Sequence, residues 1–201
     1  MLAAILENMP SDQLVIHDDV TLRDLAPGEV QIKVAHSGVC HSDLSVMNGT
    51  IPQQVPCVLG HEGAGVVTDV GDGVTHVAPG DHVIIAFSPP CGTCPFCTGR
   101  NQPNLCMTGM IAMATSQQFR RGDTVVGSMS GCGTFAEETI VPGFAAIKID
   151  QDVPLDVAAL IGCGVTTGVG AAMNTAKVSP GSSVCIIGAG GVGVAAIQGA
   201  R

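Results

Sequence analysis

The chain has 201 residues and a formal net charge of −9, and it contains neither Trp nor Tyr. Hydrophobic residues make up 46% and charged residues only 12%, which excludes an intrinsically disordered chain and requires a sizeable apolar core. The eight Lys and Arg residues are scattered singly apart from Arg120 and Arg121, so they provide no basic surface for a nucleic acid or an anionic membrane. We therefore expect small-molecule partners, with no nucleic acid and no membrane.

The N-terminal segment MLAAILENMPSDQ lacks the positively charged region and the apolar core of a signal peptide, so a cytoplasmic location is expected. The most apolar run, VCIIGAGGVGVAAIQGA, is shorter than a membrane span and contains five glycines, so no transmembrane segment is predicted. The nine cysteines are an odd number, and in a reducing compartment thiols serve metals or cores more often than disulfides.

Residues 1 to about 150 consist of short alternating or apolar runs broken by Gly and Pro, which is typical of a β-rich domain. Pro-Gly turns at 26–29 and 78–81 each precede such a run. A short helix is expected after Cys40. The predicted strands lie within 3–7, 30–38, 63–71, 81–87, 134–141 and 145–149.

The pattern changes near Asp150. One helix is predicted to begin close to Pro154 and a second one to lie within 166–178. Residues 179–201 then indicate a turn, an apolar strand, a glycine-rich turn and the start of a helix. Because one strand and part of a crossover helix cannot bury both faces of a parallel sheet, we expect the chain to be part of a longer protein.

Four cysteines lie at C-x2-C-x2-C-x8-C spacing, where disulfides, an iron–sulfur cluster and a bound metal are the alternatives. The cluster motif would have a last gap of three residues followed by Pro, which this segment lacks. Four soft thiolates at short spacing suit a closed, tetrahedral structural zinc site, which we favour. Its ligands would be Cys91, Cys94, Cys97 and Cys106.

Cys40, His61 and Cys163 are dispersed along the chain, and each taken alone is more often a buried thiol or a core histidine. Their surrounding motifs nevertheless occur in one order: GVCHSD, GHEGAGVV, the four-cysteine segment, GCGVTTG and GAGGVG. In this order the sequence resembles the zinc-containing alcohol dehydrogenases of the medium-chain dehydrogenase/reductase superfamily across essentially its whole length. The GCG form around Cys163 looks most like the branch of animal-type and glutathione-dependent formaldehyde enzymes.

The resemblance implies a mixed β and α/β fold. Residues 1–155 would form a GroES-like, β-rich catalytic domain with two zinc sites. Residues 156–201 would form connecting helices and the first βα unit of an incomplete Rossmann NAD(P)-binding domain.

The same resemblance makes Cys40, His61 and Cys163 the ligands of a catalytic zinc that keeps a fourth position open for an alcohol oxygen. The other cysteines, Cys57, Cys132 and Cys185, match no ligand position and are expected to be small core residues.

Three further residues would act beside this zinc. Ser42 matches the hydroxyl that bonds the alcohol and starts a proton relay, although a helix N-cap is its alternative interpretation. Asp43 matches the carboxylate that orients the histidine ligand, and Glu62 matches a carboxylate just behind the metal.

His41 would face the cofactor pyrophosphate and Phe87 would line the substrate channel, although a solvent-facing His41 and a core Phe87 are the alternatives. The sequence departs from animal-type enzymes at Ser45, where these commonly have the histidine that ends the proton relay. Solvent or a ribose hydroxyl would then carry the proton.

The motif GAGGVG follows an apolar run and opens a helix, so its backbone amides could approach a pyrophosphate at the helix N-terminus. The acidic residue that selects NAD or NADP is expected about 20 positions further on, past Arg201. The cofactor-binding residues would be Gly188, Gly190, Gly191, Val192 and Gly193.

The expected function is a zinc-dependent oxidoreductase that interconverts alcohols and aldehydes or ketones by hydride transfer to NAD or NADP. Oxidation of S-(hydroxymethyl)glutathione is a substrate-level alternative, and a non-catalytic zinc-binding relative is an alternative from another class. The full-length protein is expected to be a homo-oligomer.

Overall fold

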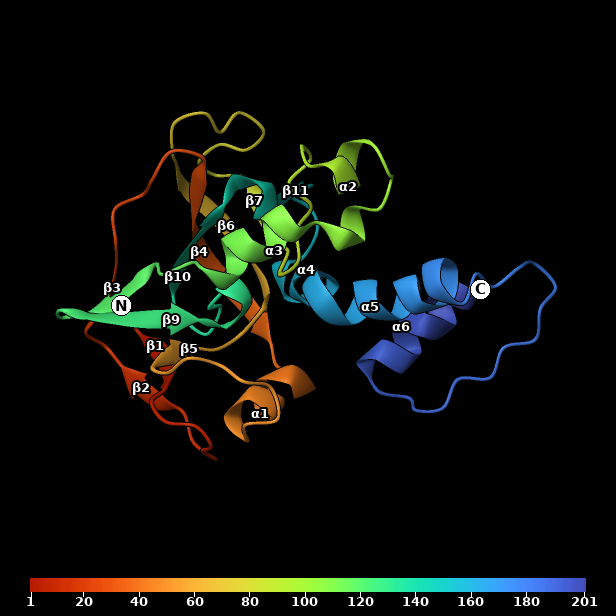
Figure 1. The fold of residues 1–201 in the computed structure, drawn as a ribbon, viewed down its shortest axis with the longest axis horizontal. Helices are drawn as coiled ribbons and strands as arrows, with labels where there is room; N and C mark the ends of the chain where they lie inside the picture. The colour runs from red at the N-terminus through yellow and green to blue at the C-terminus, as the bar shows by residue number, and fades with distance from the viewer.

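The computed structural model describes the chain from Met1 to Arg201, and its strands form two β-sheets between Ala3 and Ile149 (Figure 1). The first sheet has six short strands in the order β2-β1-β5-β9-β8-β3, in which β5 and β9 run parallel and the other neighbours antiparallel. Its strands are β1 (Ala3–Leu6), β2 (Val15–His17), β3 (Val20–Leu22), β5 (Cys57–Val58), β8 (Phe119–Arg121) and β9 (Thr124–Ser128).

The second sheet is antiparallel throughout, with five strands in the order β10-β4-β6-β7-β11. In β4 the side chains alternate: Val30 and Ile32 are fully buried, whereas Lys33 is exposed. This alternation places one face of the sheet on the main hydrophobic core. The strands are β4 (Glu29–Gly38), β6 (Glu62–Val70), β7 (His82–Ile85), β10 (Glu138–Pro142) and β11 (Ala146–Ile149).

The ladder between β4 and β6 determines where distant parts of the chain meet. It ends with Gly38 opposite Glu62. Cys40 follows the end of β4 and His61 precedes the first residue of β6. The pairing of these two strands therefore brings Cys40 and His61 to the same edge of the sheet.

The six predicted strand segments each overlap an observed strand, namely β1, β4, β6, β7, β10 and β11. Sequence analysis missed β2, β3, β5, β8 and β9. Four of these have two or three residues, too few to show an alternating pattern, and they form because neighbouring strands supply hydrogen-bond partners.

The helices connect the strands and fill the C-terminal part of the chain. The short helix expected after Cys40 is α1, and the one expected near Pro154 begins at Leu155 with Pro154 as its N-cap. The isolated helices are α1 (His41–Met47), α2 (Pro95–Thr98), α3 (Met107–Ala114) and α6 (Gly191–Ala200), with short 3-10 turns η1 (Pro103–Leu105), η2 (Met129–Gly131) and η3 (Gly143–Ala145).

One continuous helical segment, Leu155–Thr175, replaces the two helices that were predicted. It consists of α4 (Leu155–Leu160), the π-helical turn η4 (Ile161–Val165), α5 (Thr166–Gly170) and the π-helical turn η5 (Ala171–Thr175). No proline interrupts it, so its glycines remain helical. Its buried residues Ala158 and Ala159 pack beside Ala64 of β6 and Ile84 of β7.

One helix, which the sequence analysis did not single out, is long and apolar enough to cross a membrane by length and composition alone. Leu155–Thr175 has 21 residues, a mean hydropathy of 1.5 in its most apolar window, and 22% of that window buried. A single helix of this kind is weak support for a membrane span, because the core helix of a soluble protein has the same length and composition.

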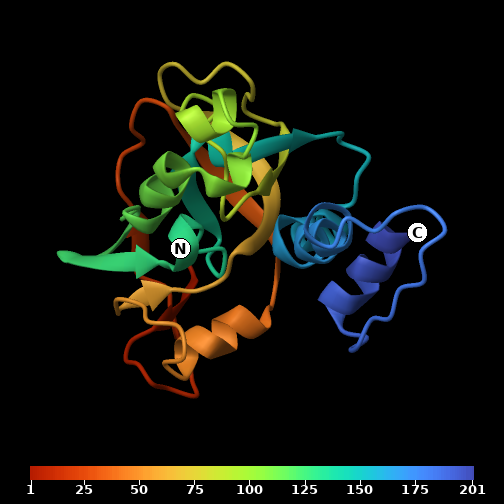
Figure 2. The same ribbon diagram turned by 45° about the vertical axis from the view of Figure 1, so that its right-hand side comes forward.

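The apolar run at 184–187 was predicted to be a strand, and it is extended chain that pairs with no other strand. Ile187 is 97% exposed, because no neighbouring strand supplies hydrogen bonds or covers its side chain. Cys185 is exposed as well, so its expected place in a core is wrong, whereas Cys57 and Cys132 are fully buried. Figure 2 shows α6 lying beside the long helix and apart from the two sheets.

Candidate metal centres

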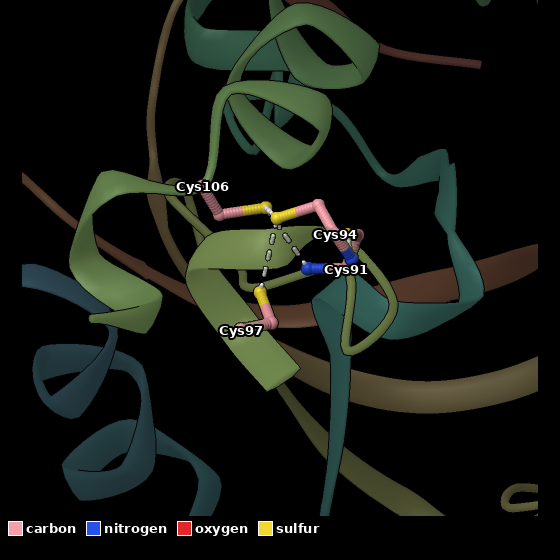
Figure 3. Close-up of side chains that lie close together, drawn as sticks. All are labelled: Cys91, Cys94, Cys97 and Cys106. Atoms are coloured by element: carbon pink, nitrogen blue, oxygen red, sulfur yellow. Dashed lines mark hydrogen bonds between the residues drawn. The ribbon is translucent and has the colours of Figure 1, made fainter. Parts of the chain in front are cut away.

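The four cysteines of the C-x2-C-x2-C-x8-C segment converge on one point in a lobe beside the second sheet (Figure 3). Their sulfur atoms all lie within 4.8 Å of one another, and Cys94 Sγ lies 3.6 Å from Cys97 Sγ and 3.7 Å from Cys106 Sγ. None of them forms a disulfide. Four thiols at this separation suit a tetrahedral ion of the zinc type.

Backbone amides of the lobe point at these sulfurs. The amides of Cys91 and Gly109 each donate to Cys106 Sγ at 3.2 Å, and these two bonds lower the pKa of Cys106. The Thr93 hydroxyl is the main cause that lowers the pKa of Cys91 to about 5. These shifts favour the thiolate form that a metal requires, whereas burial raises the pKa of Cys97 to about 11. The convergence of the four sulfurs, rather than their pKa values, is what fits a bound metal ion.

A second centre gathers Cys40, His61, Glu62 and Cys163, whose ligand atoms also lie within 4.8 Å of one another. Cys40 is the N-cap of α1, Glu62 is the first residue of β6, and Cys163 lies in the helical turn η4. The structure therefore brings the three dispersed residues together at the end of the β4–β6 ladder. It also adds a carboxylate, which sequence reasoning placed only behind the metal.

The Asp43 carboxylate orients the histidine of this centre. Asp43 is 2% exposed, and it accepts hydrogen bonds from the amides of Cys40 at 2.9 Å and Gly60 at 3.0 Å. Its Oδ1 atom lies 3.6 Å from His61 Nδ1, a buried nitrogen with no hydrogen-bond partner. The imidazole thus turns Nδ1 towards the carboxylate and leaves Nε2 for an ion, as in carboxylate–histidine–metal arrangements.

The electrostatics of the centre follow from burial and these neighbours. Burial alone would lower the pKa of His61, but the Asp43 carboxylate and the Cys163 thiol outweigh it and raise the pKa to about 10. Burial would raise the pKa of Cys40, but hydrogen bonds from Ser42 and the contact with His61 lower it. Two sulfurs, an imidazole and a carboxylate are a donor set that suits zinc.

Glu62 is 5% exposed, and its Oε1 accepts a hydrogen bond of 3.1 Å from the amide of Gly164. Sequence reasoning missed this donor, together with the amides of Gly60 and Gly109. In the sequence, Gly60 and Gly164 stand out only because each lies directly beside a candidate ligand, in the motifs GH and GCG.

The other predicted residues surround this centre. Ser42 Oγ lies 3.7 Å from Cys40 Sγ, and Ser42 is the second residue of α1, so its N-cap interpretation is wrong. The ring of Phe87 meets the His61 ring edge-on with centroids 5.7 Å apart, and Phe87 also lines a cavity of about 420 Å³. His41 is exposed, and its Nδ1 atom lies 3.3 Å from Ser45 Oγ.

The glycine-rich motif forms the turn into α6. Gly188 has φ +106°, a conformation that favours glycine, and α6 begins at Gly191 with Gly190 as its N-cap. A Cβ atom on Gly193 would collide with the carbonyl oxygen of Gly188. Gly191 and Val192, in the first turn of this ten-residue helix, are exposed to solvent.

Comparison with known proteins agrees with this architecture. A model of the alcohol dehydrogenase GroES-like domain matches residues 26–151. An S-(hydroxymethyl)glutathione dehydrogenase of Photobacterium damsela subsp. piscicida is 48% identical over 189 residues, and one of Escherichia coli O1:K1 is 47% identical. In each case the match covers 89% of this chain and 51% of the relative, so the chain spans about half the length of these relatives.

Solved structures are similar over nearly the whole chain. An alcohol dehydrogenase zinc-binding domain protein of Burkholderia ambifaria has a TM-score of 0.90 and 32% identity, covering 100% of this chain and 55% of that protein. Benzyl alcohol dehydrogenase of Acinetobacter calcoaceticus has a TM-score of 0.84 and 32% identity, covering 99% and 54%. The expected GroES-like fold and the resemblance to zinc alcohol dehydrogenases are confirmed. Because the matched domain covers more than half of the 201 residues, the chain belongs to the alcohol dehydrogenase GroES-like domain family.

Proposed function

We propose that the protein containing this chain is a zinc-dependent oxidoreductase that interconverts alcohols and aldehydes or ketones, with NAD or NADP as the hydride carrier. The observation that carries the proposal is the convergence of Cys40, His61 and Cys163 within 4.8 Å, from three elements far apart in sequence. Purely structural thiols have no need of a buried imidazole and carboxylate at the same point.

Cys40, His61 and Cys163 would hold the catalytic ion, and the Glu62 carboxylate would offer a further donor beside them. When bound, Zn²⁺ acts as a Lewis acid that lowers the pKa of an alcohol hydroxyl. Asp43 keeps the His61 ring in one orientation, and Phe87 forms an apolar wall beside it. The Ser42 hydroxyl, next to Cys40 Sγ, would accept the alcohol proton and release its own to solvent or a ribose hydroxyl.

Cys91, Cys94, Cys97 and Cys106 would hold a second, structural zinc. All four donors of this site come from the protein, so no position remains for a substrate. Its role is to fold the lobe, which has no buried residue between Cys91 and Leu105.

NAD or NADP would bind with its pyrophosphate at the N-terminus of α6, at Gly188, Gly190, Gly191, Val192 and Gly193. His41 is exposed on α1 and would supply a further contact to the pyrophosphate. In this arrangement residues 1–155 form the catalytic domain and residues 156–201 begin the cofactor-binding domain.

S-(hydroxymethyl)glutathione is the substrate-level alternative, and the names of the relatives at 48% and 47% identity favour it. The benzyl alcohol dehydrogenase, at 32% identity, favours simpler alcohols. Both substrates carry a hydroxyl on the carbon that loses hydride, so the same centre serves either. The complete enzyme would act as a homo-oligomer in the cytoplasm.

The test is the metal content and alcohol turnover of the complete protein. We expect two zinc ions per chain, with Cys163→Ser losing one zinc and all turnover, and Cys97→Ser losing the other. The matched control is Cys185→Ser, because Cys185 is exposed and belongs to neither cluster. Retention of both zinc ions and of turnover in Cys163→Ser would contradict the ligand assignment. Two zinc ions without turnover on any alcohol would favour a non-catalytic relative.

A further inference from the structure

Thr134, in the loop before β10, packs against both glycines that flank His61 and Glu62. The residue is 1% exposed. A Cβ atom on Gly60 would lie 2.5 Å from Thr134 Oγ1, and one on Gly63 would lie 2.5 Å from Thr134 Cγ2. Since real Cβ atoms do not approach so closely, the hydroxyl and the methyl group of Thr134 occupy the space that these two glycines leave open.

Hydrogen bonds connect Thr134 to the backbone of Gly60, between β5 and β6, and to β4. Its amide donates to the carbonyl oxygen of Gly60 at 3.1 Å. Its hydroxyl lies 2.7 Å from the hydroxyl of Ser37, which is opposite Gly63 in the β4–β6 ladder. Thr134 thus joins the Gly60 backbone to β4 through a side chain with no access to solvent.

Gly60 connects Thr134 to the candidate metal centre through Asp43. It has φ +87°, and its amide donates to Asp43 Oδ1 at 3.0 Å. The same oxygen lies 3.6 Å from His61 Nδ1. A displacement of Gly60 would therefore move the carboxylate that orients the histidine, although Thr134 is not one of the four donor residues.

We propose that Thr134 is a positioning residue for the centre of Cys40, His61 and Cys163, and that its hydroxyl is the required group. The inference rests on the proposed function, because it takes these residues as ligands of a metal ion. Outer partners of a metal ligand commonly change metal affinity by about 10- to 100-fold when they are lost. A threonine that only filled space would change stability alone.

The experiment compares two substitutions in the complete, zinc-loaded protein. Thr134→Val keeps the shape and removes the hydroxyl, whereas Thr134→Ser keeps the hydroxyl and removes the methyl group. The matched control is Thr139→Val, because Thr139 is also fully buried but bonds the carbonyl of Cys132 and the side chain of Gln118. Ser37→Ala removes the same hydrogen bond from its other side and tests the inference if Thr134→Val does not fold.

The readouts are zinc affinity, by competition with a chromogenic chelator, and the visible absorption spectrum after Co²⁺ replaces the ion at this centre. We expect Thr134→Val and Ser37→Ala to bind this ion about tenfold more weakly and to shift the cobalt bands, because the ligand geometry relaxes. Thr134→Ser, which keeps the hydroxyl, should have the same zinc affinity and cobalt spectrum as the wild-type protein. Thr139→Val should lower the melting temperature and leave both readouts unchanged.

Unchanged affinity and spectrum in Thr134→Val, or an equal loss in Thr139→Val, would overturn the positioning role while the proposed function stands. A wild-type protein that binds only the ion of the four-cysteine lobe would overturn the proposed function itself. The two failures are therefore distinguishable.

Discussion

Asp43 connects three parts of the candidate catalytic centre although it is not one of the four donor residues. Its carboxylate accepts the amide of Cys40, accepts the amide of Gly60 and faces His61 Nδ1. It is also the third residue of α1, so its bond to the Cys40 amide caps that helix as well. One buried carboxylate thereby fixes the position of the Cys40 backbone and the orientation of the His61 ring.

Replacement of Asp43 by Asn should weaken zinc binding at this centre by about 10- to 100-fold, as loss of a carboxylate partner of a ligating histidine does elsewhere. Asparagine offers one acceptor oxygen where the structure needs an acceptor for two amides, so one bond to Cys40 or Gly60 is lost. Chelator competition measures the affinity, and Asp69→Asn on the exposed part of β6 is the control. Equal affinity in the two variants would rule out this role for Asp43.

The sequence identified the residues of this centre better than their arrangement. The motifs GVCHSD and GHEGAG singled out Cys40, Asp43, His61 and Glu62. They did not reveal that the Glu62 carboxylate lies among the donor atoms, or that backbone amides of glycines support the acidic side chains. Such contacts depend on where the backbone passes, which the identity of a glycine does not specify.

The four-cysteine lobe has no apolar core of its own. Between Cys91 and Leu105 no residue is buried, and the lobe contains only the four-residue helix α2 and the turn η1. A segment with no apolar core cannot offset its conformational entropy without another source of stabilisation. We therefore expect metal binding to be the main stabilisation of this segment.

Loss of the metal should unfold this lobe and leave the sheets intact. In Cys97→Ser, hydrogen exchange should become fast for the amides of 91–106, and limited proteolysis should cut there, while strand amides of β4 and β6 stay protected. Cys163→Ser is the control, because it removes the other ion and should leave 91–106 protected. Protected amides across 91–106 in Cys97→Ser would show that the lobe folds without its metal.

The elements could be predicted where their residues are locally patterned. The long strands β4 and β6 alternate or are apolar over nine or ten residues, so sequence analysis recognised them. β5 has two residues and exists because β1 and β9 pair with it on either side. The run at 184–187 shows the converse, since its composition favours a strand but no partner strand is present in this chain.

At the scale of the whole molecule, the candidate cofactor-binding helix is attached to the rest through small residues. Gly168 is buried, and a Cβ atom there would collide with the carbonyl oxygen of Val192 and lie 2.6 Å from Ala195 Cβ. Gly199 lies in the same way against Val169. Glycine at these positions allows α6 to approach the long helix that also carries Cys163, so the packing of α5 and α6 couples the two candidate sites.

Gly168→Ala should therefore displace α6 and weaken nicotinamide cofactor binding, whereas Gly170→Ala should not. Alanine in place of glycine ordinarily stabilises a helix by about 0.5–1 kcal/mol, and Gly170 has room for it, because its added Cβ would meet only Asn174 Nδ2 at 3.8 Å. We expect Gly170→Ala to raise the melting temperature of the complete protein slightly and Gly168→Ala to lower it. NADH fluorescence titration should show weaker binding in Gly168→Ala alone, with two zinc ions retained in both variants. Wild-type NADH affinity together with a raised melting temperature in Gly168→Ala would mean that α6 does not depend on this close approach.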